Sequence, residues 1–241
     1  MQTSLNRVIA FGDVHGCIHG LDTVIEAIAP TRTDMLVFLG DLVDHGRDSR
    51  EVLERIVELQ SICQVVLIQG NHEEMMLAAR ENEEAFKFWQ SSGGALTLSS
   101  YRFPGKMDDV PKEHWALLES CLPFYETEDI IFTHANYLPD VPMSKQPGHQ
   151  LRWALFDPTE MRQHVSRKPV MVGHTEQREG ELLDLGFAMC LDTACWRYGW
   201  LTAVDCHTGD VWQASRWGVL REPAEATHRE KLTQIFASYS G

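Results

Sequence analysis

Five short apolar segments of this chain end in the same way. The segments AFGDVHG, VFLGDLVD, VLIQGNHE, IIFTHAN and VMVGHTE pass directly from apolar residues into Asp, Asn or His, usually through one glycine. Short runs rich in β-branched and aromatic residues are typical of buried strands. Because ligands gather outside the carboxyl ends of strands in an open α/β sheet, we expect these five loops to meet at one place.

The first ninety residues predict an α/β arrangement. The runs RVIAF, MLVFL and VVLIQ are expected to form buried strands of a mainly parallel sheet, because amphipathic stretches separate them. Apolar residues at helical spacing predict helices over 21–28 and 52–59. A third helix is expected over 73–89, and the glycines at 93 and 94 should end it.

The second half of the chain predicts a different pairing of strands. A turn-rich stretch over 101–115 is followed by the helical segment WALLESCL and by the strand candidates FYETE and DIIFT. The runs PVMVG, FAMCLDT, LTAVD and VWQAS predict a second sheet with antiparallel pairing, and THREKLTQIFASY predicts a surface helix. No internal repeat or long linker interrupts the chain, so we expect one catalytic domain over residues 1–241.

Charge and cysteine content limit the class of protein. The chain has 21 Lys and Arg against 35 Asp and Glu, a net charge of −14, which opposes binding to nucleic acid or to an anionic membrane. The six cysteines form no CxxC pair, and no apolar run approaches the roughly 20 residues of a membrane span. These features predict a reduced, cytoplasmic protein without nucleic-acid or membrane partners. They do not predict an oligomeric state.

The residues at the strand ends suit transition metals. A single Asp after a strand is more often a turn residue or a helix cap, but five such endings together favour a metal site. Carboxylate and imidazole donors without cysteine suit Mn, Fe or Zn better than calcium. The candidate ligands, enough for two divalent ions, are Asp13, His15, Asp41, Asn71, His134 and His174.

A pair of adjacent ions would activate a shared water and clamp the oxygens of a phosphoryl group. Such a reaction also needs a proton donor for the leaving oxygen. His72, next to Asn71, is the candidate, and Asp44 is its expected partner. Glu73 is expected either to orient the site or to serve as an acidic residue at a helix N-terminus.

Several motifs together resemble one family. GDVHG at 12–16, GDLVD with Gly46 and Ser49, GNHE at 70–73, the later His134 and GHT at 173–175 resemble the metal-dependent PPP-type phosphoprotein phosphatases. GNHEEMM, GGALTLSSY and LDTACWRYGWLTAV resemble the bacterial and phage branch, which includes the lambda phage phosphatase. The resemblance implies a four-layer calcineurin-like metallophosphoesterase fold, in which helices flank a β-sandwich and the two-metal site lies at one edge.

The resemblance also implies roles for the site residues. Asp13 and His15 would bind the first ion, Asp41 would bridge the two ions, and His72 with Asp44 would form the acid pair. The second ion would be bound by Asn71, His134 and His174, and Asn71 is also expected to contact the substrate phosphate.

One position departs from the family. The second motif of the family usually has an arginine that holds phosphate where this chain has His45, and a histidine cannot reproduce a bidentate guanidinium. Arg47 lies two residues later and is a candidate replacement, although a solvated loop charge is an equal alternative. Arg152 is the candidate for a second phosphate-binding arginine.

Three functions remain open from the sequence. The leading hypothesis is a manganese-dependent serine/threonine protein phosphatase, in which a metal-bridging hydroxide attacks in line and His72 protonates the leaving group. The first alternative is a hydrolase of symmetric dinucleoside polyphosphates such as diadenosine tetraphosphate, which shares the metal motifs but usually has Asp after GNH. The second is a non-catalytic metal- and phosphate-binding module, suggested by His45. The expected substrate is therefore a phosphorylated protein or a small phosphoester.

Overall fold

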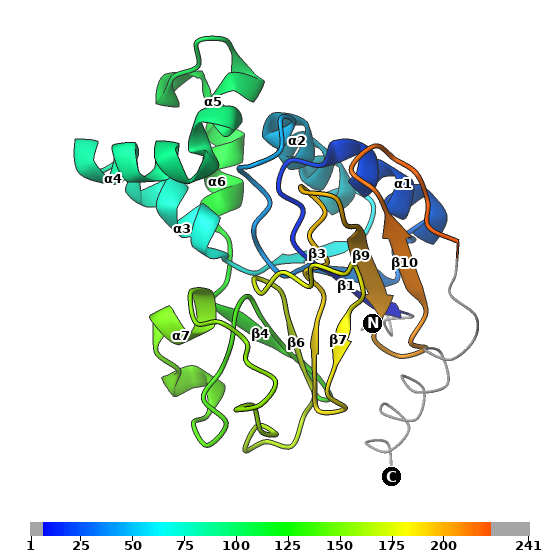
Figure 1. The fold of residues 1–241 in the computed structure, drawn as a ribbon. Helices are drawn as coiled ribbons and strands as arrows, with labels where there is room; N and C mark the ends of the chain where they lie inside the picture. Colours follow the sequence, from blue (N-terminus) through cyan, green and yellow to red (C-terminus); the bar gives the residue numbers. More distant parts are fainter. Residues whose placement is uncertain (1–6, 223–241) are drawn as a thin grey trace.

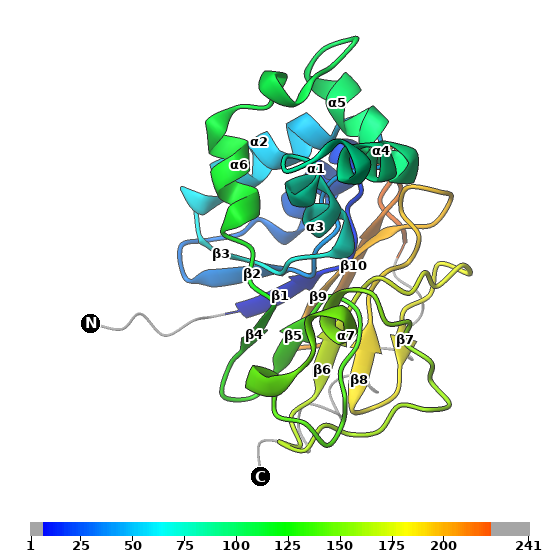
Figure 2. The ribbon, with the colours of Figure 1, turned by 90° about the vertical axis from the view of Figure 1, so that its left-hand side faces the viewer.

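Two five-stranded sheets pack face to face in the computed structural model, which describes residues 7–222 (Figures 1 and 2). The first sheet has the order β10-β9-β1-β2-β3. Its parallel strands β1 (Arg7–Phe11), β2 (Asp34–Phe38) and β3 (Gln64–Leu67) are the three predicted from the N-terminal runs. The antiparallel hairpin β9 (Leu201–Asp205) and β10 (Val211–Ala214) completes it beside β1.

The second sheet has the order β4-β5-β6-β8-β7. Its parallel centre consists of β5 (Ile131–Thr133), β6 (Val170–Val172) and β8 (Ala188–Cys190). The edge strands β4 (Phe124–Glu126) and β7 (Leu183–Asp184) pair antiparallel to it.

The prediction that LTAVD and VWQAS belong to the second sheet is wrong. Both faces of β9 are apolar: Leu201 and Ala203 pack toward the helices, whereas Val204 packs between the two sheets. Such a strand must be covered on both sides, and the free edge of β1 offers that place. The expected antiparallel pairing exists within this hairpin, but the second sheet itself is mixed.

Alternation along β1 explains the layers. Ile9 and Phe11 face the helices, whereas Val8 and Ala10 face the second sheet, because successive side chains of a strand point to opposite faces. A third apolar cluster, including Ile131 and Val172, covers the outer face of the second sheet. The expected helix-flanked β-sandwich is confirmed.

Helices cover the outer face of the first sheet. Leu21, Val24 and Ile28 are buried in α1 (Ile18–Ile28), which together with α2 (Ser49–Gln60) lies on this face. A second group of helices lies to the left of α1 and α2 in Figure 1: α3 (Asn71–Ala78), α4 (Glu83–Trp89), α5 (Ala95–Tyr101) and α6 (Lys112–Glu119). The short α7 (Gly148–Arg152) lies beside the second sheet, and single turns occur at Gln90–Gly94, Met107–Asp109 and Met143–Lys145.

The single helix expected over 73–89 is two helices. The side chain of Asn82 accepts a hydrogen bond from the backbone N–H of Ala85 at 2.9 Å, so Asn82 caps a new helix and interrupts the first. The expected stop at the two glycines is a kink, because Gly93 has φ 119° and helical structure resumes at Ala95.

The expected surface helix in THREKLTQIFASY lies outside the described residues. Within residues 7–222, no helix combines the length and the apolar character that crossing a membrane requires. The cytoplasmic location and the single domain stay predictions.

Candidate two-metal site

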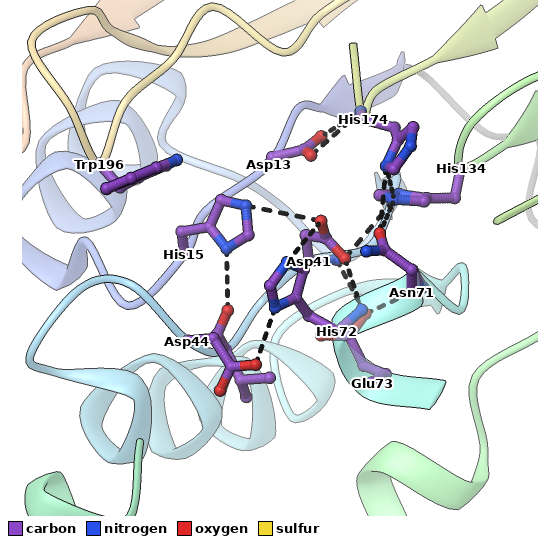
Figure 3. A network of polar contacts seen from close by, with 12 residues as sticks. Asp13, His15, Asp41, Asp44, Asn71, His72, Glu73, His134, His174 and Trp196 are labelled. Atoms are coloured by element: carbon purple, nitrogen blue, oxygen red, sulfur yellow. Dashed lines mark hydrogen bonds and ion pairs between the residues drawn. The ribbon is translucent and has the colours of Figure 1, made fainter. Parts of the chain in front are cut away.

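The loops after β1, β2, β3, β5 and β6 converge where the two sheets meet, as the strand endings predicted (Figure 3). Asp13 and His15 follow β1, Asp41 follows β2, and Asn71 begins α3 directly after β3. His134 and His174 arrive from the second sheet, after β5 and β6. All six predicted ligands therefore lie in one cluster, although the chain between the first and the last spans over 160 residues.

The first group of possible metal ligands consists of His15, Asp13 and Asp41. Single ligand atoms of Asp13, His15 and Asp41 lie within 4.8 Å of one another. The Nδ1–H of His15 donates to the carbonyl of Val43 at 2.9 Å, so Nε2 keeps its lone pair. That Nε2 lies 3.5 Å from Oδ2 of Asp41. This is the tautomer that a metal ligand requires.

The second group contains electron-pair donors that face one another. His134 donates its Nδ1–H to Leu39 O at 2.8 Å, and His174 donates its Nε2–H to Trp153 O at 3.2 Å. The remaining nitrogens, His134 Nε2 and His174 Nδ1, lie only 3.2 Å apart and 3.0 and 3.1 Å from Oδ1 of Asn71. Three acceptors without a proton among them repel one another, and a cation between them removes that repulsion.

Asp41 links the two groups. Its Oδ2 lies 3.5 Å from His15 Nε2, and its Oδ1 lies 3.5 Å from His134 Nε2. One carboxylate thus presents an oxygen to each side, the arrangement that a bridging ligand needs.

Burial tunes the charges of these groups. Desolvation and neighbouring carboxylates raise the pKa of Asp13 well above its ordinary value, and burial raises the pKa of Asp41 to about 8. Burial lowers the pKa of His15, His134 and His174, which keeps these imidazoles neutral. Neutral imidazoles are ready to bind a metal, and buried carboxylates this close need a cation to stay ionised.

The backbone at the site is strained. His15, Asp41 and His174 have φ of 44°, 50° and 64°, the left-handed region that side chains with a Cβ rarely adopt. The backbone N–H of His174 donates to both oxygens of Asp13, at 3.1 and 3.0 Å. A Cβ at Gly173 would lie 2.1 Å from Asp13 Oδ1, so only glycine permits this approach.

The predicted acid pair is in hydrogen-bonding contact. The Nδ1–H of His72 donates to Asp44 Oδ2 at 2.8 Å, and Asp44 is completely buried. Burial opposes the charge of His72, but the carboxylates of Asp41 and Asp44 raise its pKa to about 9. The raised pKa favours the protonated ring, and Nε2 of His72 lies 4.0 Å from Oδ2 of the central Asp41.

Besides Asn71, the candidate phosphate contacts are His45, Arg152 and Arg47, and these three occupy different positions. The ring of His45 lies 4.9 Å from that of His15 and 4.8 Å from that of His72, so His45 faces the site. The side chain of Arg152 is 16% exposed and forms an ion pair with Glu74 at 2.6 Å. The side chain of Arg47 is exposed and does not share the half-buried position of His45.

The structure adds residues that the motifs did not assign. Both expectations for Glu73 hold: it lies in the first turn of α3, and its carboxylate accepts the N–H groups of Asp41, Leu42 and Gly70 at 2.8, 2.8 and 2.9 Å. Asp192 is buried close enough to Asp13 to raise its pKa. Because Asp192 follows the apolar run AMCL, the regularity that identified the other acids also applies to it.

The profile of the calcineurin-like phosphoesterase family matches residues 6–175, more than half of the chain. The chain belongs to this family. The family uses a divalent metal centre, and the donor groups of this site fit one.

Similar proteins fall into two groups. A symmetrical bis(5'-nucleosyl)-tetraphosphatase of Erwinia tasmaniensis is 41% identical over 130 residues, 53% of this chain and 43% of that protein. Serine/threonine-protein phosphatase 1 of Salmonella typhimurium is 36% identical over 89 residues, 36% of this chain and 39% of that protein. The matches thus span less than half the length of either relative.

A solved structure supports the fold. A crystal structure provisionally described as that of a diadenosine tetraphosphatase has a TM-score of 0.66 and 20% identity. It covers 88% of this chain and 94% of its own. At that identity the likeness concerns the fold alone, and it agrees with the calcineurin-like family match.

Proposed function

We propose that this protein is a two-metal hydrolase of symmetric dinucleoside polyphosphates. The observation that carries hydrolysis is the position of Asp41 between two groups of metal donors, with Nε2 of His72 4.0 Å from its Oδ2. The substrate class is supported by the 41% identity to the Erwinia tetraphosphatase over 130 residues.

Asp13, His15, Asp41, Asn71, His134 and His174 would hold the two ions, which we propose to be Mn, with Fe and Zn as alternatives. When bound, such ions supply a nucleophilic hydroxide and neutralise the phosphoryl oxygens. His72 donates its Nε2 proton to the leaving phosphate oxygen as the bond from phosphorus to that oxygen breaks. Asp44 holds the ring during this transfer. Symmetric cleavage of a tetraphosphate chain releases two nucleoside diphosphates.

Phosphate contacts come from three places in this proposal. Asn71 is one of the metal donors, His45 lies beside His15 and His72, and the largely buried Arg152 lies near His134 of the second group. Arg152 approaches the substrate by exchanging Glu74 for a phosphate oxygen. Arg47, which is exposed, contributes only if its loop moves inward.

The sequence favoured a serine/threonine protein phosphatase instead, because GNHE carries Glu73 and because Asp44 is present. The similarities favour the dinucleotide substrate over that expectation. A phosphoprotein substrate remains the second candidate, on the basis of the 36% identity to the Salmonella phosphatase over 89 residues. A non-catalytic module has no need of an acid pair, so the His72–Asp44 contact argues against that alternative.

The test compares two substrates on the metal-loaded protein. Diadenosine tetraphosphate and a phosphoserine peptide are incubated with the Mn-loaded chain, and kcat/KM and the nucleotide products are measured. We expect faster cleavage of the dinucleotide, with ADP as the single product. Faster cleavage of the peptide would support the phosphatase instead. Absence of hydrolysis with both substrates and with an aryl phosphate would support the non-catalytic module.

The role of His72 is tested with His72→Asn. The variant is expected to lose roughly 10²-fold or more in kcat while it retains two equivalents of metal, as general acids contribute about 10² to 10⁴ in rate. Full activity of a metal-loaded variant would contradict the assigned role.

A further inference from the structure

The carboxylate of Asp44 is held by more than His72. Thr97 Oγ1–H donates to Oδ1 at 2.6 Å. The indole Nε1–H of Trp89 lies 3.1 Å from Oδ1 and 2.9 Å from Oδ2. Asp44, Trp89 and Thr97 are all completely buried. Three side chains thus donate hydrogen bonds to the carboxylate of Asp44. His72 is the proposed acid, whereas Thr97 and Trp89 have no part in the acid pair.

The hydroxyl of Thr97 has a complete set of partners. Its one proton goes to Asp44 Oδ1. Its lone pairs accept the backbone N–H of Asp44 at 2.9 Å and the hydroxyl of Ser49 at 3.1 Å. Asp44 has φ 71°, so these contacts hold both its side chain and a left-handed backbone conformation.

Glycines shape the segment that supplies both donors. Trp89 is the last residue of α4, and Thr97 lies in α5, beyond the kink. Gly93 has φ 119°, which lets the chain bend between the two helices. A Cβ at Gly94 would lie 2.3 Å from the indole of Trp89, so glycine makes room for the ring. The stretch WQSSGGALT is therefore built to bring an indole and a hydroxyl to Asp44.

We propose that Trp89 and Thr97 are positioning residues for the acid pair, an inference that rests on the proposed function. Two fixed donors leave Asp44 one orientation, in which Oδ2 meets His72 Nδ1 and the ring of His72 holds Nε2 at 4.0 Å from Asp41 Oδ2. Without them, the carboxylate rotates about its side-chain torsions, and the ring of His72 loses its fixed orientation. The segment 89–97 thus acts on the reaction without touching the substrate.

The dependence of the rate on the leaving group separates this role from a merely structural one. Protonation by His72 matters most when the leaving oxygen is a poor leaving group, and little when it departs readily as an anion. A positioning defect therefore slows phenyl phosphate far more than 4-nitrophenyl phosphate. A general loss of folded or metal-loaded protein slows both esters equally.

The test uses Thr97→Val, Thr97→Ser and Trp89→Phe in the Mn-loaded protein, with Ser99→Ala as the control. Ser99 is exposed on the same helix as Thr97. For each variant, kcat and KM are measured with both esters, together with metal content and melting temperature. Thr97→Val is expected to lose roughly tenfold in kcat with phenyl phosphate and less than about threefold with 4-nitrophenyl phosphate, with KM unchanged.

Thr97→Ser restores the hydroxyl and is expected to restore most of the rate with phenyl phosphate, whereas Ser99→Ala should match the parent. Equal losses with both esters in Thr97→Val, or no loss at all, would overturn the proposal. If Trp89→Phe does not fold, the result with Thr97→Val alone decides. His72→Asn separates the acid role of His72 from the positioning role of Trp89 and Thr97. If it reduces phenyl phosphate hydrolysis and Thr97→Val does not, only the positioning role fails. If His72→Asn has no effect, the acid role that the proposed function gives to His72 fails, and the positioning role fails with it.

Discussion

The imidazole of His45 lies flat against the indole of Trp196, with ring centroids 4.2 Å apart and planes inclined by 12°. The guanidinium of Arg197 lies 4.1 Å from the same indole, and Glu176 accepts its Nε–H at 2.8 Å. Burial, followed by the proximity of His72, lowers the pKa of His45 to about 4. The position that carries a phosphate-binding arginine in PPP-type enzymes therefore holds a fixed, neutral ring in this protein.

Replacing that ring with a guanidinium should strengthen phosphate binding. His45→Arg is expected to lower the inhibition constant of inorganic phosphate by about tenfold, because charge-assisted hydrogen bonds are roughly twice as strong as neutral ones. The constant is measured with an aryl phosphate as substrate. Arg50→Ala, at an exposed position of α2, serves as the control and should change it less than about twofold. An unchanged constant in His45→Arg would place His45 away from the substrate.

Metal binding should stabilise the fold, since the donor groups repel one another without a cation. Adding Mn to the chelated protein is expected to raise the unfolding free energy by roughly 2.7 kcal/mol for each bound ion at a hundred times its dissociation constant. His174→Ala should lose one metal equivalent and about half of the total gain, as measured by metal analysis and thermal melting. His207→Ala, at an exposed histidine, should retain both. Two equivalents bound to His174→Ala would contradict the ligand assignment.

Glu73 should contribute to stability through the loop that carries Asp41. Glu73→Gln keeps one acceptor oxygen but presents an amide N–H to backbone donors, so it should lower the unfolding free energy by about 2 kcal/mol. Urea denaturation of the chelated protein measures the change without metal linkage. Glu84→Gln, at an exposed position of α4, should remain within about 0.5 kcal/mol of the parent. The same midpoint for both variants would argue against an anchoring role of Glu73.

The ion pair of Arg7 with Asp34 should make stability depend on pH far from the site. Arg7 donates to both oxygens of buried Asp34, at 3.1 and 2.7 Å, and these bonds hold the pKa of that carboxyl below its ordinary 3.8. A lowered pKa means that the stabilisation is complete above the unfolded value and disappears as the pH falls through the folded one. Asp34→Asn should therefore cost about 1 to 2 kcal/mol at pH 7 and much less near pH 3.

Urea midpoints at the two pH values measure this difference, and Asp108→Asn, at an exposed aspartate, is the control. An equal cost of Asp34→Asn at both pH values would mean that the charge of Asp34 makes no contribution.

Many strands and helices could be predicted from local sequence patterns, because buried residues recur along the chain at the spacing of a strand or a helix. The strands around Ile9 and Leu36 and the helical face of Leu21, Val24 and Ile28 are visible as spacing. The assignment of β9 to a sheet is not visible in this way, because a run with two apolar faces fits any covered position. The interruption at Asn82 was not predicted, because apolar residues continue at helical spacing on both sides of it. The side chain of Asn82 nevertheless caps a new helix there.

The candidate metal donors could be predicted from the sequence, because glycine, Asp, Asn and His at strand ends form a local pattern, and the candidate pair of His72 and Asp44 came from motifs of the same kind. Which lone pairs face one another, and which residues hold Asp44, depends on the tertiary structure. His134 Nε2 faces His174 Nδ1 because Leu39 and Trp153 fix their tautomers, and Trp89 and Thr97 reach Asp44 from about fifty residues away. Such hydrogen bonds depend on how side chains from distant segments are oriented relative to one another. The spacing of residues along the chain does not contain that information.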